Sequence, residues 1–416
     1  MSLRTSREIL VTPGPTMIPD EVLGAMHRPT VDLYSEALHE VTLSCLADLR
    51  ALFRGSGDTY IYAANGHGVW EGALSNTLSR GETVLVLESG QFAKGWGEMA
   101  RMLGVLVETL PGDWRRAVNP EKLCEKLKAD KAHKIKAVLV VQVDTASGVC
   151  NDIAAIREAI DAASHPALLM VDVIASLAAI PFEMDAWRVD VAVGAAQKAL
   201  MMTPGLGFVA TSAKAKEANR TAGLRTLYWD WQFRDGKEHY KKYCGTCPEH
   251  LLFGLRKSLD LIKAEGLDRV HHRHRLLAEA TRRAVSVWAQ SGALSLNATE
   301  PSERSDSVTV IRLEARYAER LMDYCRNVCG VVLGVNIGEL SGEGFRIGHM
   351  GDITAATILG TLGVIETALG ALSVPHGKGG VAAAIDYLAR STAKTSTAAV
   401  EKPRSAAKKV EAPVGA

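Results

Sequence analysis

Short apolar runs alternate with helical patterns from about residue 58 to residue 210, and this alternation is the strongest constraint on the fold. The runs are rich in Val, Leu and Ile. Strands of this kind with helices between them predict a mostly parallel sheet covered on both faces. The expected strands span residues 59–63, 83–87, 137–143, 168–171, 189–193 and 207–210. Ligands of such sheets bind at the carboxyl ends of the strands, so polar residues directly after a run are candidates for a functional site.

Helix signals support the same interpretation. Asn119 precedes Pro120, which is an N-cap residue followed by proline at the first helical position. Helical patterns also cover residues 152–164 and 249–277, and the basic run 271–275 is expected to be a solvated helical face. The apolar residues of 353–374 recur at steps of four and three, which predicts an amphipathic helix packed on a core rather than a membrane span.

The chain is too long for one folding unit. It has 416 residues, and single hydrophobic cores stop growing at roughly 250–300 residues. We expect an N-terminal arm at residues 1–21, a large domain at 22–270 and a smaller C-terminal α/β domain at 271–388. Residues 389–416 are rich in Ala, Ser and Thr and are expected to form a disordered tail, because they offer little apolar surface to bury.

Composition narrows the class of protein. The 48 basic and 47 acidic side chains give a net charge of +1, which argues against a nucleic-acid binder. The seven cysteines favour free thiols over a disulfide framework. Cys244, Cys247, Cys325 and Cys329 could offer four thiolates to zinc, but free thiols are the plainer interpretation. Since the N-terminus lacks a signal-peptide pattern, we expect a cytoplasmic protein with no metal, membrane or nucleic-acid partner.

Two ionisable residues follow neighbouring predicted strands. Asp172 comes directly after the run 168–171, and Lys198 follows the run 189–193 among small residues. An amine and a carboxylate at adjacent strand ends suit pyridoxal phosphate, because the lysine can bind the aldehyde covalently and the carboxylate can keep the pyridine nitrogen protonated. The alternative is an ordinary surface ion pair.

A glycine-containing turn adds to this pattern. Asn65-Gly66-His67-Gly68 follows the first predicted strand and opens a helical pattern. Backbone N–H groups at a helix start converge on an anion, and the helix dipole favours negative charge there. The spacing is neither a P-loop nor a dinucleotide fingerprint. Together with Lys198 and Asp172, the turn predicts a phosphate-binding cup.

Five motifs resemble class V pyridoxal-phosphate aminotransferases, and most closely the alanine–glyoxylate, serine–glyoxylate and serine–pyruvate group. They lie at residues 12–16, 70–74, 172–176, 196–198 and 345–351. The resemblance runs from about residue 8 to residue 388. It implies a fold-type-I transferase with a seven-stranded, mostly parallel sheet in the large domain, pyridoxal 5′-phosphate as cofactor and a homodimer as the active unit.

The resemblance also implies a role for each matching residue. Lys198 would bind the cofactor and move the proton, Asp172 would face the pyridine nitrogen, and Arg346 would clamp the substrate α-carboxylate. The other implied contacts are Gly66, His67 and Gln197 at the phosphate, Phe92 and Ile174 on the two ring faces, Thr145 at the phenolic oxygen, Tyr243 and Thr246 at the neighbouring subunit's phosphate, and Gly14 and Asn65 at the substrate. Each has a plainer alternative, such as a core Phe92 or an Arg346 paired with Glu339 or Glu343.

The expected function is transfer of the amino group of alanine or serine to glyoxylate, or to pyruvate, by a ping-pong mechanism. Two alternatives are a lyase or desulfurase with a thiol nucleophile, for which Cys329 is the nearest cysteine before Arg346, and a catalytically silent cofactor-binding module. The donor stays open, because residues 31–35 lack the His-Arg pair of many bacterial serine–glyoxylate members. Ile337 stands where pyridoxamine–pyruvate enzymes carry an arginine.

Overall fold

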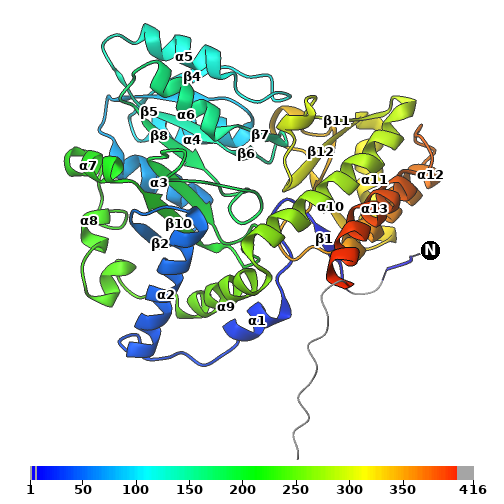
Figure 1. Cartoon of the computed structure of the whole chain (residues 1–416), viewed down its shortest axis with the longest axis horizontal. Coiled ribbons are helices and arrows are strands. Elements are labelled where there is room, and N and C mark those ends of the chain that lie inside the picture. Colours follow the sequence, from blue (N-terminus) through cyan, green and yellow to red (C-terminus); the bar gives the residue numbers. More distant parts are fainter. Residues whose placement is uncertain (1, 5–6, 401–416) are drawn as a thin grey trace, which may run out of the picture.

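A seven-stranded sheet forms the centre of the larger part of the molecule (Figure 1). The computed structural model describes residues 2–4 and 7–400. The strand order is β2 (Thr59–Ala64), β10 (Gly205–Thr211), β9 (Val191–Ala195), β8 (Leu168–Asp172), β5 (Ile135–Val141), β3 (Thr83–Leu87) and β4 (Leu106–Leu110). Only β10 runs antiparallel to its neighbours β2 and β9, and the other pairs are parallel. The predicted mostly parallel sheet is therefore confirmed.

Helices cover both faces of this sheet. One core contains residues of α3 (Gly66–Thr77), α4 (Gln91–Met102) and α7 (Ala213–Thr221). The other contains residues of α1 (Asp20–Met26), α2 (Glu36–Phe53), α5 (Pro120–Ala129), α6 (Ile153–Ala162) and α9 (Glu249–Glu265). Successive side chains of a strand point to opposite faces, so Leu85 and Leu87 of β3 enter one core and Val84 and Val86 enter the other. Burial on both faces explains why the strand sequences are continuously apolar.

Local signals placed several helices correctly. The Asn119 side chain accepts hydrogen bonds from the backbone N–H groups of Glu121 and Lys122, and Pro120 is the first residue of α5. The predicted stretch 249–277 is divided at Gly266, whose φ of 88° ends α9 and starts α10 (Leu267–Trp288). The edge strand β4 was not predicted, because it is only partly buried.

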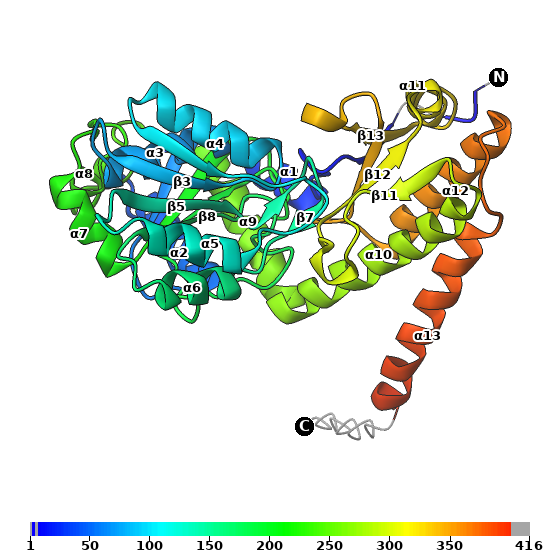
Figure 2. The ribbon, with the colours of Figure 1, turned by 90° about the horizontal axis from the view of Figure 1, so that it is seen from above.

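A five-stranded sheet organises the smaller part of the molecule (Figure 2). Its order is β1 (Ile9–Val11), β13 (Val331–Val335), β14 (Gly344–Gly348), β12 (Val308–Leu313) and β11 (Leu294–Leu296). The helices α10, α11 (Ala315–Asp323) and α12 (Ala355–Ala371) share its core, and α13 (Gly380–Val400) packs along α10. The N-terminal strand β1 pairs in parallel with β13, so residues 9–11 belong to this second sheet. Helix α10 continues through residue 270, where the sequence suggested a boundary between domains.

The C-terminal tail differs from its expected form. Helix α13 continues to Val400, so residues 389–400 are helical where disorder was expected. This stretch is rich in alanine, which has the highest helix propensity and can extend a helix that is already nucleated. The rest of the expected tail, residues 401–416, lies outside the described residues.

The basic run 271–275 is not a fully solvated face. His271 and His274 are buried, at 7% and 0% exposure. Arg273 pairs with Glu265 at 2.7 Å and donates to the carbonyls of residues 351 and 353. Arg273 and His274, whose Nε2 accepts from the backbone N–H of Gly351 at 3.0 Å, thus join α10 to the loop before α12.

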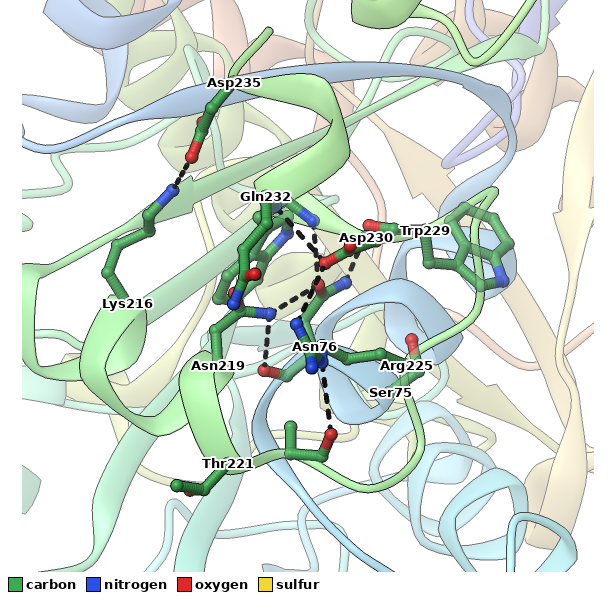
Figure 3. Close-up of polar contacts among 12 residues, drawn as sticks. Ser75, Asn76, Lys216, Asn219, Thr221, Arg225, Trp229, Asp230, Gln232 and Asp235 are labelled. Atoms are coloured by element: carbon green, nitrogen blue, oxygen red, sulfur yellow. Dashed lines mark hydrogen bonds and ion pairs between the residues drawn. The ribbon is translucent and has the colours of Figure 1, made fainter.

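An aromatic segment, residues 226–246, is fixed to helix α3 by an asparagine pair (Figure 3). It includes α8 (Trp231–Arg234) and a 3₁₀ helix at His239–Lys242. Asn76 Nδ2 donates to the Trp229 carbonyl at 2.8 Å, and Asn76 Oδ1 accepts from the backbone N–H of Trp231 at 3.0 Å. Asn219 Nδ2 of α7 donates to the same Oδ1 at 2.9 Å. One buried side chain therefore connects α3, α7 and the aromatic segment.

Candidate active site

A cavity of about 140 Å³ lies where β5 and β8 end, beside the turn that follows β9. The residues predicted for the site that line it are Asn65, Gly66, His67, Phe92, Thr145, Asp172, Ile174, Gln197 and Lys198. The structure thus brings together most of the predicted residues, although they come from five separate stretches of the sequence.

Lys198 reaches this cavity from a turn three residues beyond β9. The parallel pairing of β8 with β9 places the ends of both strands at one edge of the sheet, with Asp172 beside Val193. The Lys198 Nζ donates to the Pro13 carbonyl. Burial lowers the pKa of Lys198 to about 8, and the nearby charge of Arg346 acts in the same direction. A neutral amine is therefore accessible to this lysine near physiological pH.

Asp172 is buried, at 3% exposure, and both of its carboxylate oxygens accept hydrogen bonds. The Trp70 indole Nε1 donates to Oδ2 at 2.7 Å, and the backbone N–H of Ile174 donates to Oδ1 at 2.7 Å. Burial raises the pKa of Asp172 to about 7, and these two donors oppose that rise. Trp70 was not predicted as a site residue, although it lies one helical turn after Gly66 in one of the motifs.

An aromatic and an aliphatic side chain, Phe92 and Ile174, face the cavity. Trp70 meets Phe92 edge-on, with ring centroids 6.3 Å apart. A Cβ atom at Gly66 would lie 2.6 Å from the Cδ1 of Ile174, so a larger residue would force the end of the Ile174 side chain to move.

Helix α3 begins at the cavity. Asn65 is its N-cap, and the Oδ1 of Asn65 accepts from the backbone N–H of Gly68 at 3.1 Å. The first N–H groups of a helix lack intrahelical partners and attract anions. Gln197 adds a buried Oε1 with no hydrogen-bond partner among the described residues. A polar atom of this kind at a cavity wall fits a site built for a polar ligand.

Arg346 of β14 approaches from the second sheet and is 7% exposed. Its Nε donates to the Val335 carbonyl at 2.8 Å, and its Nη1 donates to the Thr145 carbonyl at 3.0 Å. The alternative pairing with surface acids is not found, because Glu339 pairs with Lys94 at 3.0 Å and Glu343 pairs with Arg312 at 2.7 Å. The guanidinium is thus oriented by backbone carbonyls and has no ion pair with a carboxylate among the described residues.

Gly14 covers Lys198 from the N-terminal segment. Its φ is 114°, and a Cβ atom there would lie 2.6 Å from the Lys198 Nζ. Two hydrogen bonds from Thr16 hold this segment in place: its backbone N–H donates to the Gln197 carbonyl at 3.2 Å, and its Oγ1 donates to the Lys198 carbonyl at 2.8 Å. Any side chain at position 14 would displace the lysine.

Tyr243 and Thr246 are not brought to this cavity. The Tyr243 hydroxyl lies 2.9 Å from the Thr42 Oγ1 on α2, and Thr246 is exposed. Neither residue lines the cavity of its own chain. Their contact with a neighbouring subunit's phosphate stays a prediction.

Asp144 is a further buried group that was not predicted. It is 0% exposed, and burial raises its pKa to about 6. It follows the predicted run 137–143 directly, so the rule of inspecting polar residues after strands would have found it.

The described residues contain no group of three or more potential ligands that could hold a metal. None of the helices described is long and apolar enough to cross a membrane.

Comparison with solved structures places this arrangement among the fold-type-I enzymes that depend on pyridoxal phosphate. The pyridoxamine–pyruvate aminotransferase of Mesorhizobium loti matches with a TM-score of 0.85 at 26% identity, over 94% of this chain and 100% of that one. The chain belongs to the aminotransferase class-V family, whose sequence model matches residues 63–339. The cofactor of this family is pyridoxal phosphate, and the groups at the cavity fit it: the amine of Lys198, the carboxylate of Asp172 and the backbone N–H groups at the start of α3.

Two characterised relatives cover nearly the whole chain. The serine–glyoxylate aminotransferase of Methylorubrum extorquens is 40% identical over 92% of this chain and 97% of its own length. The L-aspartate–glyoxylate aminotransferase of Paracoccus denitrificans is 37% identical over 94% of this chain and 98% of its own length. The expected family and the aminotransferase class are thus confirmed.

Proposed function

We propose that the protein transfers the amino group of alanine or serine to glyoxylate, or to pyruvate. The charge of the cavity carries this proposal. Among the described residues that line it, Lys198 is the only lysine and there is no arginine. Arg346, which donates to the carbonyl of the lining residue Thr145, would be the carboxylate clamp. A donor with a second carboxylate would bury that charge without a partner, which costs several kcal/mol. Alanine and serine bring no such charge.

The residues of the chain divide the work between them. Bound pyridoxal phosphate supplies an aldehyde and a ring that accepts electrons. Lys198, with a pKa of about 8, would accept the α-proton of the donor on its Nζ. It would then deliver that proton to the carbon of the cofactor's former aldehyde group. Asp172 would hold a proton at the pyridine nitrogen, and Thr145 would contact the phenolic oxygen. The N–H groups at the start of α3, with Gln197, would bind the phosphate.

Arg346 would bind the α-carboxylate of the donor and, later, that of the oxo acid. Because one guanidinium serves both, the two substrates occupy the site alternately, and the kinetics are ping-pong. The activities of the two relatives support glyoxylate as acceptor, and they differ in the donor. A thiol-dependent lyase is less well supported, since no cysteine is among the described residues lining the cavity.

A comparison of donors tests the proposal. The measurement is kcat/KM for alanine, serine, aspartate and glutamate with glyoxylate at saturation. We expect alanine or serine to exceed aspartate and glutamate by roughly a hundredfold, as an unpaired buried charge implies. Because the relative from Paracoccus denitrificans is an L-aspartate–glyoxylate aminotransferase, aspartate is the most informative alternative donor. If aspartate gives the highest value, the proposed donor class is wrong and a further cation must reach the cavity.

We also propose that the active unit is a homodimer in the cytoplasm. Support for the dimer comes from Tyr243 and Thr246, which do not line the cavity of their own chain. Support for a reducing compartment comes from the seven cysteines, all of which are free thiols. Sedimentation of the holoenzyme at working concentration tests the assembly.

A further inference from the structure

Asp144 occupies a fixed position at the start of helix α4. It ends the short strand β6 (Val143–Asp144). Its Oδ2 accepts from the backbone N–H groups of Phe92 at 2.8 Å and Ala93 at 3.0 Å, and its Oδ1 accepts from that of Ala146 at 3.0 Å. A Cβ atom at Gly90 would lie 2.2 Å from the Asp144 Cγ, so the carboxylate fills all the space at this helix start. Three hydrogen bonds and close packing leave it no alternative position.

The same turn also holds Arg346. The carbonyl of Thr145, the residue after Asp144, accepts from the Arg346 Nη1 at 3.0 Å. The Asp144 carboxylate is thus fixed near the guanidinium without an ion pair to it within the described part of the chain. Burial lowers the pKa of Arg346 to about 10, and Asp144 opposes this change. The two charges therefore interact through space at a distance that the turn sets.

This arrangement bears on how tightly the site holds a carboxylate. Buried Arg346 has only carbonyl oxygens as hydrogen-bond acceptors in the described residues, so its positive charge acts with little screening on a ligand in the cavity. A fixed negative charge nearby lowers the electrostatic potential at the position of that ligand. In a ping-pong reaction the arginine must release one carboxylate before it binds the next.

We propose that Asp144 is a positioning residue that limits the affinity of Arg346 for carboxylates, so that the donor and acceptor acids can exchange at one site. This proposal rests on the proposed function only in assigning both carboxylates to Arg346. It differs from a purely structural role, in which Asp144 caps α4 and holds the backbone of Phe92. Loss of a structural cap would loosen the site and weaken carboxylate binding, whereas loss of a counter-charge would strengthen it.

The test is the affinity of the holoenzyme for formate, a carboxylate that cannot react, measured by calorimetry in the wild-type protein and in Asp144→Asn. We expect formate to bind roughly tenfold more tightly to the variant, because a like-signed charge near the ligand is removed. We also expect kcat and the KM for glyoxylate to fall together, as product release slows. Asp144→Ser, which is neutral and keeps one acceptor oxygen, must also bind formate more tightly than the wild-type protein. It replaces the asparagine variant if that variant does not fold.

Asp152→Asn is the matched control. Asp152 also caps a helix, accepting from the backbone N–H of Ala155 at 3.0 Å, but it is exposed and does not line the cavity. Its loss should leave formate affinity unchanged. Unchanged or weaker formate binding in a folded Asp144 variant would overturn the proposal and leave Asp144 as a helix cap. If formate binding tightens but alanine and serine prove to be poor donors, the proposed donor class fails while the role of Asp144 stands.

Discussion

Burial adjusts the ionisation of the two central residues in opposite directions. It lowers the pKa of Lys198 to about 8 and raises that of Asp172 to about 7. In water the lysine would be almost wholly charged and the aspartate almost wholly ionised at neutral pH. The same apolar surroundings therefore make an amine available as a base and make a carboxylate sensitive to each hydrogen bond that it accepts.

The lowered pKa of Lys198 has a direct consequence for cofactor capture. Only a neutral amine attacks an aldehyde, so the rate of covalent capture by the cofactor-free protein should rise with pH and reach half of its maximum near pH 8. An exposed lysine would reach half of its maximum only near its ordinary pKa of about 10.4. The measurement is the absorbance of the adduct against pH, followed by borohydride reduction and peptide mapping. An adduct on Lys94 or Lys214 instead of Lys198 would overturn the assignment.

Substitution of Trp70 tests how its hydrogen bond affects the pKa of Asp172. In Trp70→Phe the carboxylate loses its 2.7 Å donor, so its pKa should rise and it should hold a proton at the pyridine nitrogen less well. We expect the acidic limb of the kcat/KM profile to move up by about one pH unit, as befits one hydrogen bond to a charged group. Trp96→Phe is the control, because Trp96 stacks on Trp70 at 5.9 Å and its Nε1 has no partner in the described residues. Equal shifts in both variants would exclude a specific role for the Trp70 donor.

The functional residues at strand ends could be predicted from the sequence. The residues that hydrogen-bond to them could not. Lys198 and Asp172 follow apolar runs that local periodicity reveals. The hydrogen bond from Trp70 to Asp172 joins positions 102 residues apart, and no local pattern indicates such a contact. Asp144 follows a predicted run, but the resemblance drew attention to its neighbour Thr145. The functional roles carried over by resemblance for Phe92, Thr145 and Arg346 remain predictions.

At the scale of elements, strands buried on both faces were predicted best. The run 83–87 coincides with β3 (Thr83–Leu87), because burial on both faces makes the whole strand apolar. The aromatic segment 226–246 could not be predicted in this way. Its order depends on Asn76 and on Arg234, which is 1% exposed and donates to the carbonyls of Tyr228 and Ile61. The bonds of Asn76 to the segment and of Arg234 to Ile61 join positions more than 150 residues apart.

Asn76 therefore offers a test of how the aromatic segment is held. Asn76→Ala removes the acceptor of the Trp231 N–H and a donor to the Trp229 carbonyl. Because the buried Trp231 N–H and the buried Asn219 Nδ2 both lose the Asn76 Oδ1 as acceptor, the free energy of unfolding should fall by about 3 kcal/mol. Ser75→Ala is the control, since Ser75 makes a single hydrogen bond, to the Gly72 carbonyl, and its loss should cost about 1 kcal/mol. Denaturant unfolding gives both values, and equal losses would contradict the proposed anchoring.

At the scale of the whole molecule, the residues predicted for the site come from both sheets. Lys198 and Asp172 come from the seven-stranded sheet, and Arg346 comes from the five-stranded sheet. The N-terminal segment links them, since β1 pairs within the second sheet and Gly14 then passes over Lys198. A cofactor bound on the first sheet and a carboxylate bound from the second would therefore be held by parts of the chain that fold around separate cores.

Hybrid dimers can decide whether Tyr243 serves the neighbouring site. Tyr243→Phe removes one hydroxyl, and in the homodimer cofactor affinity should fall by roughly tenfold, the effect of one hydrogen bond to a charged group. A hybrid with Lys198→Ala in one subunit and Tyr243→Phe in the other contains one site with Lys198 and a partner's tyrosine. That site should bind the cofactor with wild-type affinity, and the hybrid should show about half of the wild-type activity, because one of two sites in a two-fold dimer is intact. If Tyr243 acted within its own subunit, the only site with Lys198 would also carry phenylalanine, and affinity would stay at the low value. The titration of purified hybrid with pyridoxal phosphate separates these results without reference to the amino donor.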